Sequence, residues 1–129
     1  MKKIILVFVL FTVLSCGNKA VEKPENLIDK EVMADILYDL AIMQSAESNN
    51  PLFFLQNDVK VNEMIYKKYH IDSTSFAQSN RYYASDAHNY QKLFKKVSER
   101  IMAKKEELNQ QSLKETGKPI APSDAPAIQ

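Results

Sequence analysis

The sequence contains little glycine and a single cysteine, and each shortage excludes a class of protein. Only two glycines occur, Gly17 and Gly117, so no glycine-rich loop exists whose backbone could approach a phosphate. The one cysteine, Cys16, leaves the chain without an internal disulfide. Seventeen basic and sixteen acidic residues nearly cancel, which is unlike the strongly basic balance of nucleic-acid-binding domains. We therefore expect no nucleic-acid partner and a fold held by side-chain packing.

The residues before Cys16 have the pattern of an export signal. Residues 1–3 form a short basic start, and residues 4–14 form an apolar run that only Thr12 interrupts. This run is too short for a membrane-spanning helix, which needs about 20 apolar residues. A small residue, Ser15, precedes the cysteine. The pattern predicts a signal peptide over residues 1–15 that is cleaved before Cys16.

The end of this segment resembles the bacterial lipoprotein signal, in which Leu and two small residues usually precede the cysteine. Ser15 and Cys16 fit that signal, whereas Val13 and Leu14 depart mildly from it. The resemblance implies that Cys16 becomes the first mature residue and is acylated on its thiol and amino group. Each buried acyl CH₂ contributes ~0.8 kcal/mol, and two or more chains give stable anchoring. The expected partner at Cys16 is therefore membrane lipid.

The residues after Cys16 favour one side of the membrane. Lipoproteins of the resembled kind that reach the cell surface tend to carry an acidic cluster directly after the cysteine, and residues 17–24 contain little acid. We therefore expect an outer-membrane protein that is lipid-anchored, with the periplasmic face favoured over the cell surface.

Composition divides the rest of the chain into three segments. Residues 16–27 have no apolar period and indicate a tether, residues 28–113 carry helical periodicity, and residues 114–129 are rich in proline and polar residues. The expected fold class is all-α. It is a small bundle of about four helices between an N-terminal lipid tether and a disordered C-terminal tail.

Caps and apolar spacing predict the helix boundaries. The four expected helices are one from Asp29 to about Ser48, one over about 55–69, a short one capped by Asp72, and one capped by Ser85 or Asp86. Phe53 and Phe54 either join the second of these helices or pack as part of a loop. The side chains predicted for the core are Met33, Ile36, Leu37, Leu40, Ile65, Phe76, Tyr83, Phe94, Val97 and Ile101. Lys104 and Lys105 fall at core-phase positions. The last helix should therefore leave the bundle near Ala103 and continue as an exposed rod for a turn or two.

A second resemblance lies in residues 65–83, IYKKYHIDSTSFAQSNRYY, where an Ile-Asp pair is followed by Phe76, a serine and a Tyr-Tyr pair. This arrangement is similar to a family of small Bacteroidota lipoproteins known only as a domain of unknown function. The run from Asp35 to Asp39 resembles the first helix of that family, so the resemblance covers about residues 27–108. It implies a helical fold and a lipoprotein context, and it implies no activity.

Few residues are spaced for chemistry. Asp35 and Asp39 share one helix face, where two carboxylates could hold a metal or a proton, but a solvated face is the commoner reason for this spacing. His70 and His88 are isolated beside helix boundaries, and Ser79 has no glycine-rich elbow around it. We therefore expect no catalytic residue, no metal site and no cofactor, and thus a protein that is not an enzyme.

The tyrosines leave one candidate contact residue. Side chains of successive helical residues point about 100° apart, so if Tyr83 joins Phe76 in the core, Tyr82 faces a flank and can contact a partner. Two function classes remain open. One is a non-enzymatic interaction or scaffolding lipoprotein that docks on an envelope protein. The other is a periplasmic carrier or chaperone that holds an apolar segment between its helices.

Overall fold

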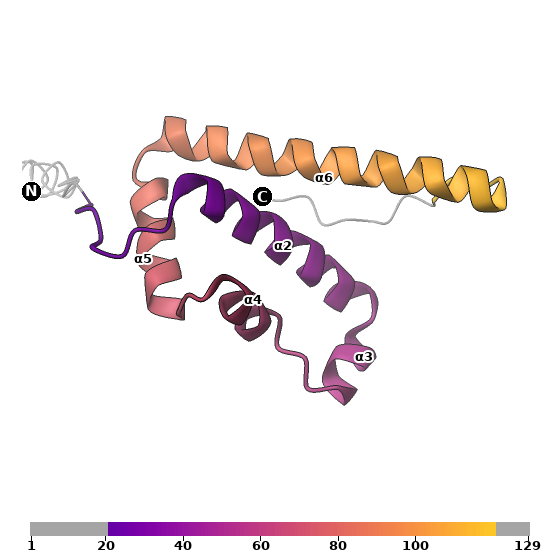
Figure 1. The fold of residues 1–129 in the computed structure, drawn as a ribbon, viewed down its shortest axis with the longest axis horizontal. Coiled ribbons are helices and arrows are strands. Elements are labelled where there is room, and N and C mark those ends of the chain that lie inside the picture. The colour runs from indigo at the N-terminus through magenta and orange to yellow at the C-terminus, as the bar shows by residue number, and fades with distance from the viewer. Residues whose placement is uncertain (1–20, 121–129) are drawn as a thin grey trace, which may run out of the picture.

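The computed structural model describes residues 21–120, which form an all-α fold. Its helices are α2 (Lys30–Asn49), α3 (Pro51–Gln56), α4 (Val61–Tyr69), α5 (Ser73–Ala84) and α6 (Ala87–Thr116). The central element is α2, because α6, α4 and α3 all pack against it, whereas α5 packs against α6 (Figure 1). The predicted fold class is confirmed. Cys16, the predicted signal peptide and residues 121–129 lie outside the described residues.

Three aspartates begin helices as the sequence predicts. Asp29 accepts a hydrogen bond from the Glu31 amide (2.8 Å), Asp72 from the Ser75 amide (2.7 Å), and Asp86 from the Asn89 amide (3.0 Å). Each carboxylate therefore satisfies an amide that has no partner inside its helix. Between the two candidates for the start of α6, Asp86 is the N-cap, and Ser85 instead ends α5.

The helix predicted over about 55–69 is wrong in its first half, because two helices occupy the region. Asn50 caps α3 by accepting a hydrogen bond from the Phe53 amide (3.4 Å), and Pro51 suits the first helical turn. The backbone then takes a left-handed conformation at Asp58 (φ 48°), which no α-helix can contain, and α4 begins at Val61. The described chain therefore has five helices where about four were expected.

The core lies where α2, α4 and α6 meet. Its buried members are Ile28, Met33, Ala34, Ile36, Leu40, Phe54, Val61, Ile65, Leu93 and Val97. Of the predicted core residues, Leu37, Phe76, Tyr83 and Ile101 are partly buried and pack against this cluster.

Phe94 is the one predicted core residue that neither belongs to this cluster nor packs against it. Leu93, which the prediction left out, is only 2% exposed, whereas Phe94 is half-buried and packs edge-on against Tyr90 with 4.7 Å between ring centroids. Leu93 and Val97 are four residues apart, so they form the stripe of α6 that faces α2. Phe94 lies about 100° around the helix from Leu93.

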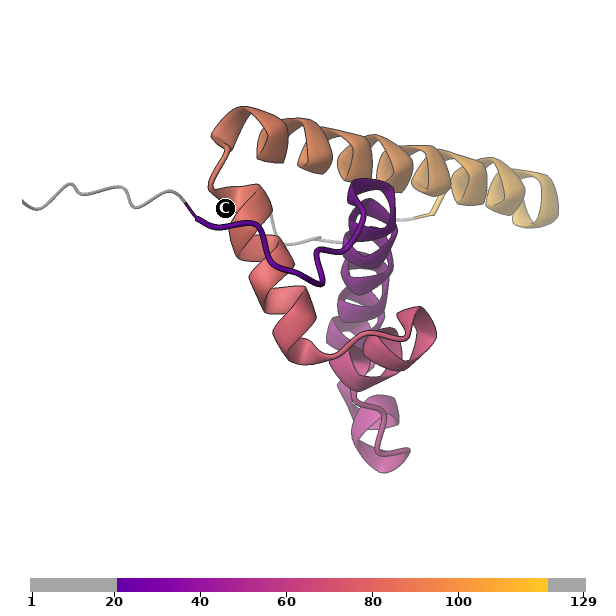
Figure 2. The same ribbon diagram turned by 60° about the vertical axis from the view of Figure 1, so that its left-hand side comes forward.

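Beyond Ile101, α6 contributes no buried residue and continues past the other helices to Thr116 (Figures 1 and 2). This exposed rod agrees with the position of Lys104 and Lys105, but it is longer than the one or two turns predicted. Side-chain pairs along the rod account for its length, since they stabilise a helix locally. They are Lys104 with Glu107, Gln110 with Glu106, and Gln111 with Glu115.

Candidate interaction site

The two carboxylates of α2 that share a face bind different partners. Arg100 of α6 donates a hydrogen bond to Asp35, and the Arg100 guanidinium stacks over the Tyr38 ring, 4.6 Å from its centroid. The pKa of Arg100 is raised, chiefly by its hydrogen bond to Asp35. The contact therefore ties α6 to α2 by charge and by cation–π attraction.

Asp39 ties α4 to α2 in the same manner. Its carboxylate accepts hydrogen bonds from Lys68 Nζ (2.5 Å) and from the Tyr69 hydroxyl (2.6 Å). Burial acts to raise the pKa of the Asp39 carboxyl, but these hydrogen bonds and the Lys68 and Arg100 charges outweigh it, so the pKa lies below its ordinary value. Burial and the hydrogen bond to Asp39 raise the pKa of Tyr69 well above its usual range. Asp35 and Asp39 therefore both take part in contacts between helices.

Ser79 and Tyr83 together hold the segment that precedes α2. The Ser79 hydroxyl is completely buried and accepts a hydrogen bond from the Ile28 amide (3.0 Å). The Tyr83 hydroxyl donates to the Ile28 carbonyl (2.6 Å), and burial raises the pKa of Tyr83. Both backbone groups of Ile28 are thus satisfied by α5, so Ser79 serves the fold.

The two histidines are exposed and lie apart in the fold. His70 ends α4 in a left-handed conformation (φ 53°), and His88 lies in the first turn of α6. Within residues 21–120, no three His, Cys, Asp or Glu side chains gather as a metal site. In the same part of the chain, no helix is both long and apolar enough to cross a bilayer.

Tyr82, the predicted contact residue, lies on α5 next to Tyr83, whose hydroxyl bonds to the segment that leads into α2. Its side chain is half-buried, and its ring packs edge-on against Tyr83 with 5.7 Å between centroids. Tyr83 packs against the core, as expected, and Tyr82 lies on its flank. Its role as a contact stays a prediction.

An exposed apolar surface on α3 is the feature that sequence reasoning missed. Leu52, Phe53 and Leu55 are 65%, 52% and 78% exposed, while Phe54 between them is buried against the core. Isolated exposed apolar residues are common, but three on one short helix form a patch. The signal was the sequence Pro51-Leu-Phe-Phe-Leu-Gln56, since a helix with four successive apolar residues cannot turn all of them toward one neighbour.

The apolar surface of α3 is remote from the N-terminal end of the described chain. The residues that lead into α2 pass along α5 at one end of the molecule, and α3 follows the opposite end of α2 (Figures 1 and 2). Tyr82 therefore belongs to the first end, and Leu52, Phe53 and Leu55 belong to the second.

The comparisons with known proteins agree with one part of the second resemblance, namely that the chain contains a domain of unknown function. A family described as a domain of unknown function (DUF4296) matches residues 24–107, which include α2 to α5 and most of α6. No curated protein and no solved structure matches the chain. Because the match covers well over half of the sequence, the chain belongs to the DUF4296 family.

Proposed function

We propose that the protein is a lipid-anchored, non-enzymatic interaction module of the cell envelope that docks on a protein partner through α3. The observation that carries this proposal is the exposure of Leu52, Phe53 and Leu55 on a helix that Phe54 fixes to the core. Clusters of large apolar side chains on a rigid element are what protein interfaces use as binding hot spots.

The chemistry of α3 favours a protein partner over a membrane surface. Helix α3 has no charged residue, and Asn50 and Asn57 flank it. Helices that lie on membranes combine an apolar face with lysine or arginine, which attract anionic headgroups. The partner should therefore offer an apolar pocket with a polar rim, into which Leu52 and Leu55 insert.

The tether and α3 suit a docking role because they lie at opposite ends. A module attached through Cys16 to the outer membrane, on its periplasmic face, would present α3 away from the lipid. The contacts of Asp35 and Asp39 support a non-enzymatic role, since both carboxylates hold neighbouring helices.

Replacement of the lipidated cysteine tests the anchor. The Cys16→Ser variant should lose labelling with a fatty-acid analogue and should accumulate as precursor or leave the membrane fraction. The wild-type protein provides the labelled control. Continued labelling of the serine variant would disprove the lipid anchor at Cys16 and would leave the docking surface to be judged separately.

Site-specific crosslinking tests the docking surface. A photo-crosslinking amino acid at Leu55 should join the full-length, membrane-bound protein to one partner in a fixed ratio. The same probe at Tyr82 tests the residue predicted from the sequence, and a probe at the exposed Lys67 of α4 serves as the control. A triple Leu52→Ser, Phe53→Ser, Leu55→Ser variant should abolish recovery of that partner while its helical circular dichroism is kept.

The outcome also separates docking from the carrier alternative. Recovery of one partner at Leu55 supports docking. A broad set of unfolded clients at Leu55 would support a periplasmic carrier instead, and equal products at Leu55 and Lys67 would refute a specific surface on α3.

A further inference from the structure

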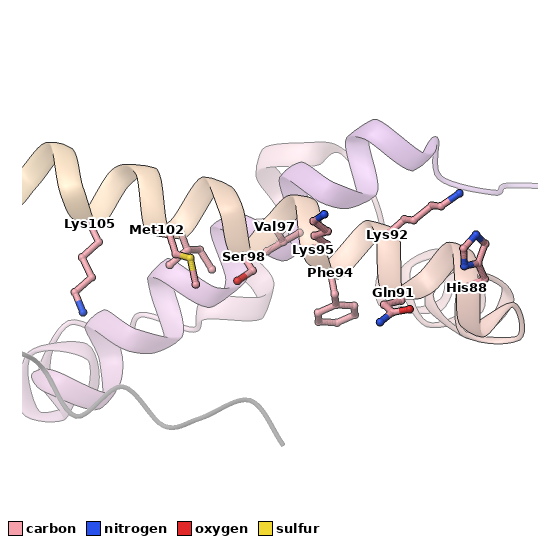
Figure 3. A pocket seen from close by; sticks show the side chains of 10 residues that line it. His88, Gln91, Lys92, Phe94, Lys95, Val97, Ser98, Met102 and Lys105 are labelled. Atoms are coloured by element: carbon pink, nitrogen blue, oxygen red, sulfur yellow. The ribbon is translucent and has the colours of Figure 1, made fainter.

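A hollow lies along α6, and every described residue that lines it belongs to this helix. Its apolar part is formed by Phe94, Val97, Ile101 and Met102, of which Val97 is buried and Met102 is 66% exposed. Figure 3 shows the side chains of α6 that line this hollow. It is separate from the α3 surface, and it borders the Leu93 stripe that faces α2, because Val97 of that stripe also lines it.

The hollow is also basic. Lys92, Lys95 and Lys105 line it, and no acidic side chain of the described chain does. Lys95 lies 3.8 Å from Glu99, but among residues 21–120 no carboxylate forms an ion pair with Lys92 or Lys105. The face therefore suits a segment that brings apolar side chains together with negative charge.

The chain itself turns back toward this face after α6 ends. Gly117 adopts a left-handed conformation (φ 68°), and its amide donates to the Leu113 carbonyl (3.0 Å). The Ser112 hydroxyl then donates to the Lys118 carbonyl (2.9 Å), and the Ile120 amide donates to Asn109 Oδ1 (3.0 Å). Residues 118–120 thus run antiparallel to α6, along the side that carries Asn109 and Ser112.

That side of α6 continues directly into the hollow. Moving back from Asn109 in steps of three or four residues gives Lys105, Met102, Ser98 and Phe94, which form one stripe of a helix. Residues 118–120 therefore contact α6 at the end of the stripe that leads to Phe94.

We propose that residues 121–129 of this chain bind along the hollow of α6. From Asn109 back to Phe94 the helix measures ~22 Å at a rise of 1.5 Å per residue. Residues 121–129 contain Pro122 and Pro126 and reach ~28 Å at about 3.1 Å per residue in the extended conformation that proline favours. The segment is therefore long enough to cover the hollow.

Asp124 can pair with the lysines of the hollow and Ile128 can pack against its apolar part. Both lie at distances along the segment that correspond to positions on α6. Asp124 lies ~12 Å along an extended chain from Ile120, which is level with Ile101 and about one helical turn from Lys105. Ile128 lies ~25 Å along, level with Phe94. Residues 121–129 are too few to form a hydrophobic core of their own, but they can bury apolar side chains against the hollow of α6. Its attachment to α6 raises its effective concentration there.

A single tryptophan tests this proposal, because the chain has none. The full-length Ile128→Trp protein, kept in detergent micelles, should show blue-shifted emission and reduced quenching by acrylamide. Met102→Glu in the same background should shift the emission to the red and restore quenching. Lys67→Glu, on exposed α4, is the control that should change neither.

A charge exchange tests the pairing of the segment with the hollow. In the Ile128→Trp background, Lys105→Glu or Asp124→Lys alone should increase quenching, and the two together should restore protection. Added salt should weaken the single-charge effects.

Three results would overturn the proposal. One is full quenching of the tryptophan in the Ile128→Trp protein, and a second is protection that survives Met102→Glu, which would come from the detergent. The third is protection that depends on protein concentration together with a dimer mass in sedimentation, because a second copy would then occupy the hollow.

Discussion

The two halves of α6 form one continuous helix, but different interactions stabilise them. The half up to Ile101 places Leu93 and Val97 in the core against α2 and pairs Arg100 with Asp35. The half from Lys104 to Thr116 is stabilised by side-chain pairs along its own surface and by the Gly117 cap. The first half thus depends on tertiary packing, whereas the second depends on local interactions of a few tenths of a kcal/mol each.

This difference predicts how substitutions act. A change in the packed half should alter the free energy of unfolding of the whole domain. A change in the exposed half should alter only local opening, which hydrogen exchange detects and global unfolding does not.

The largest effect should come from truncating the buried leucine of α6. Leu93→Ala should lower the free energy of unfolding by about 2 to 5 kcal/mol, because it removes a side chain that is 2% exposed and leaves a cavity. Phe94→Ala, one position away, should lower it by less than about 2 kcal/mol, since its ring is half-buried on the outer side. Urea unfolding followed by circular dichroism measures both.

Leu108→Ala provides the matched control in the exposed half of the same helix. Leu108 is 42% exposed, so its truncation should change stability by no more than about 0.5 kcal/mol. If Phe94→Ala destabilised the domain as much as Leu93→Ala, the distinction between the two faces of α6 would be wrong.

Leu93 and Phe94 also show where sequence reasoning fails. Helical periodicity identified α6 and its apolar character, and the stripe of Tyr90, Phe94 and Val97 is present. Yet Leu93 with Val97 fits the same 3.6-residue period. Which of two neighbouring stripes is buried depends on how α2 lies against the helix, and periodicity carries no information on that packing.

The same distinction between local and tertiary causes applies to the rest of the fold. Asp29, Asp72 and Asp86 were predictable as caps because each acts within three residues of itself. The contact of Ser79 with Ile28 joins positions 51 residues apart, and that of Arg100 with Asp35 joins positions 65 apart. Such pairs have no signature in a single sequence.

The next effect in size concerns a polar contact of the body. Ser79→Ala should lower the free energy of unfolding by about 1 to 3 kcal/mol, because the buried Ile28 amide loses its acceptor. Thermal unfolding measures the loss. Thr74→Ala, at an exposed position of the same helix, is the control and should change stability by about 0.5 kcal/mol at most. Equal effects of the two variants would show that the hydrogen bond to Ile28 is absent in solution.

A smaller effect, with a dependence on pH, should come from Asp39. Its pKa is lowered in the folded state, so its contribution to stability is present above the unfolded pKa of ~3.9 and is lost as the pH falls through the folded value. Asp39→Asn should therefore cost about 1 kcal/mol near pH 7, since the Lys68 partner is largely exposed. The difference from wild type should shrink below about pH 4.

Urea unfolding at a series of pH values checks this dependence, with Asp58→Asn as the control. Asp58 is exposed and left-handed (φ 48°), a conformation that asparagine tolerates, so this variant should match wild type across the series. A difference between Asp39→Asn and wild type that stayed constant down to about pH 2 would contradict the lowered pKa.

The smallest global effect should come from the end of the exposed half. Gly117→Ala places a Cβ in a left-handed conformation (φ 68°), which costs roughly 1 to 2 kcal/mol locally, while no atom within 4 Å opposes the added methyl. The last turn can respond by fraying, which opens the hydrogen bond from the Gly117 amide to the Leu113 carbonyl and the exposed hydrogen bonds of Thr116 and Lys118. Global stability should therefore change by less than about 0.5 kcal/mol, whereas amide exchange over residues 114–117 should accelerate.

The control is Gly117→Asn, because asparagine accepts the left-handed conformation more readily than alanine does. Its amides over residues 114–117 should exchange faster than those of the wild type and more slowly than those of Gly117→Ala. A loss of several kcal/mol in global unfolding of Gly117→Ala would mean that the exposed half is coupled to the core, and the contrast between the two halves of α6 would not hold.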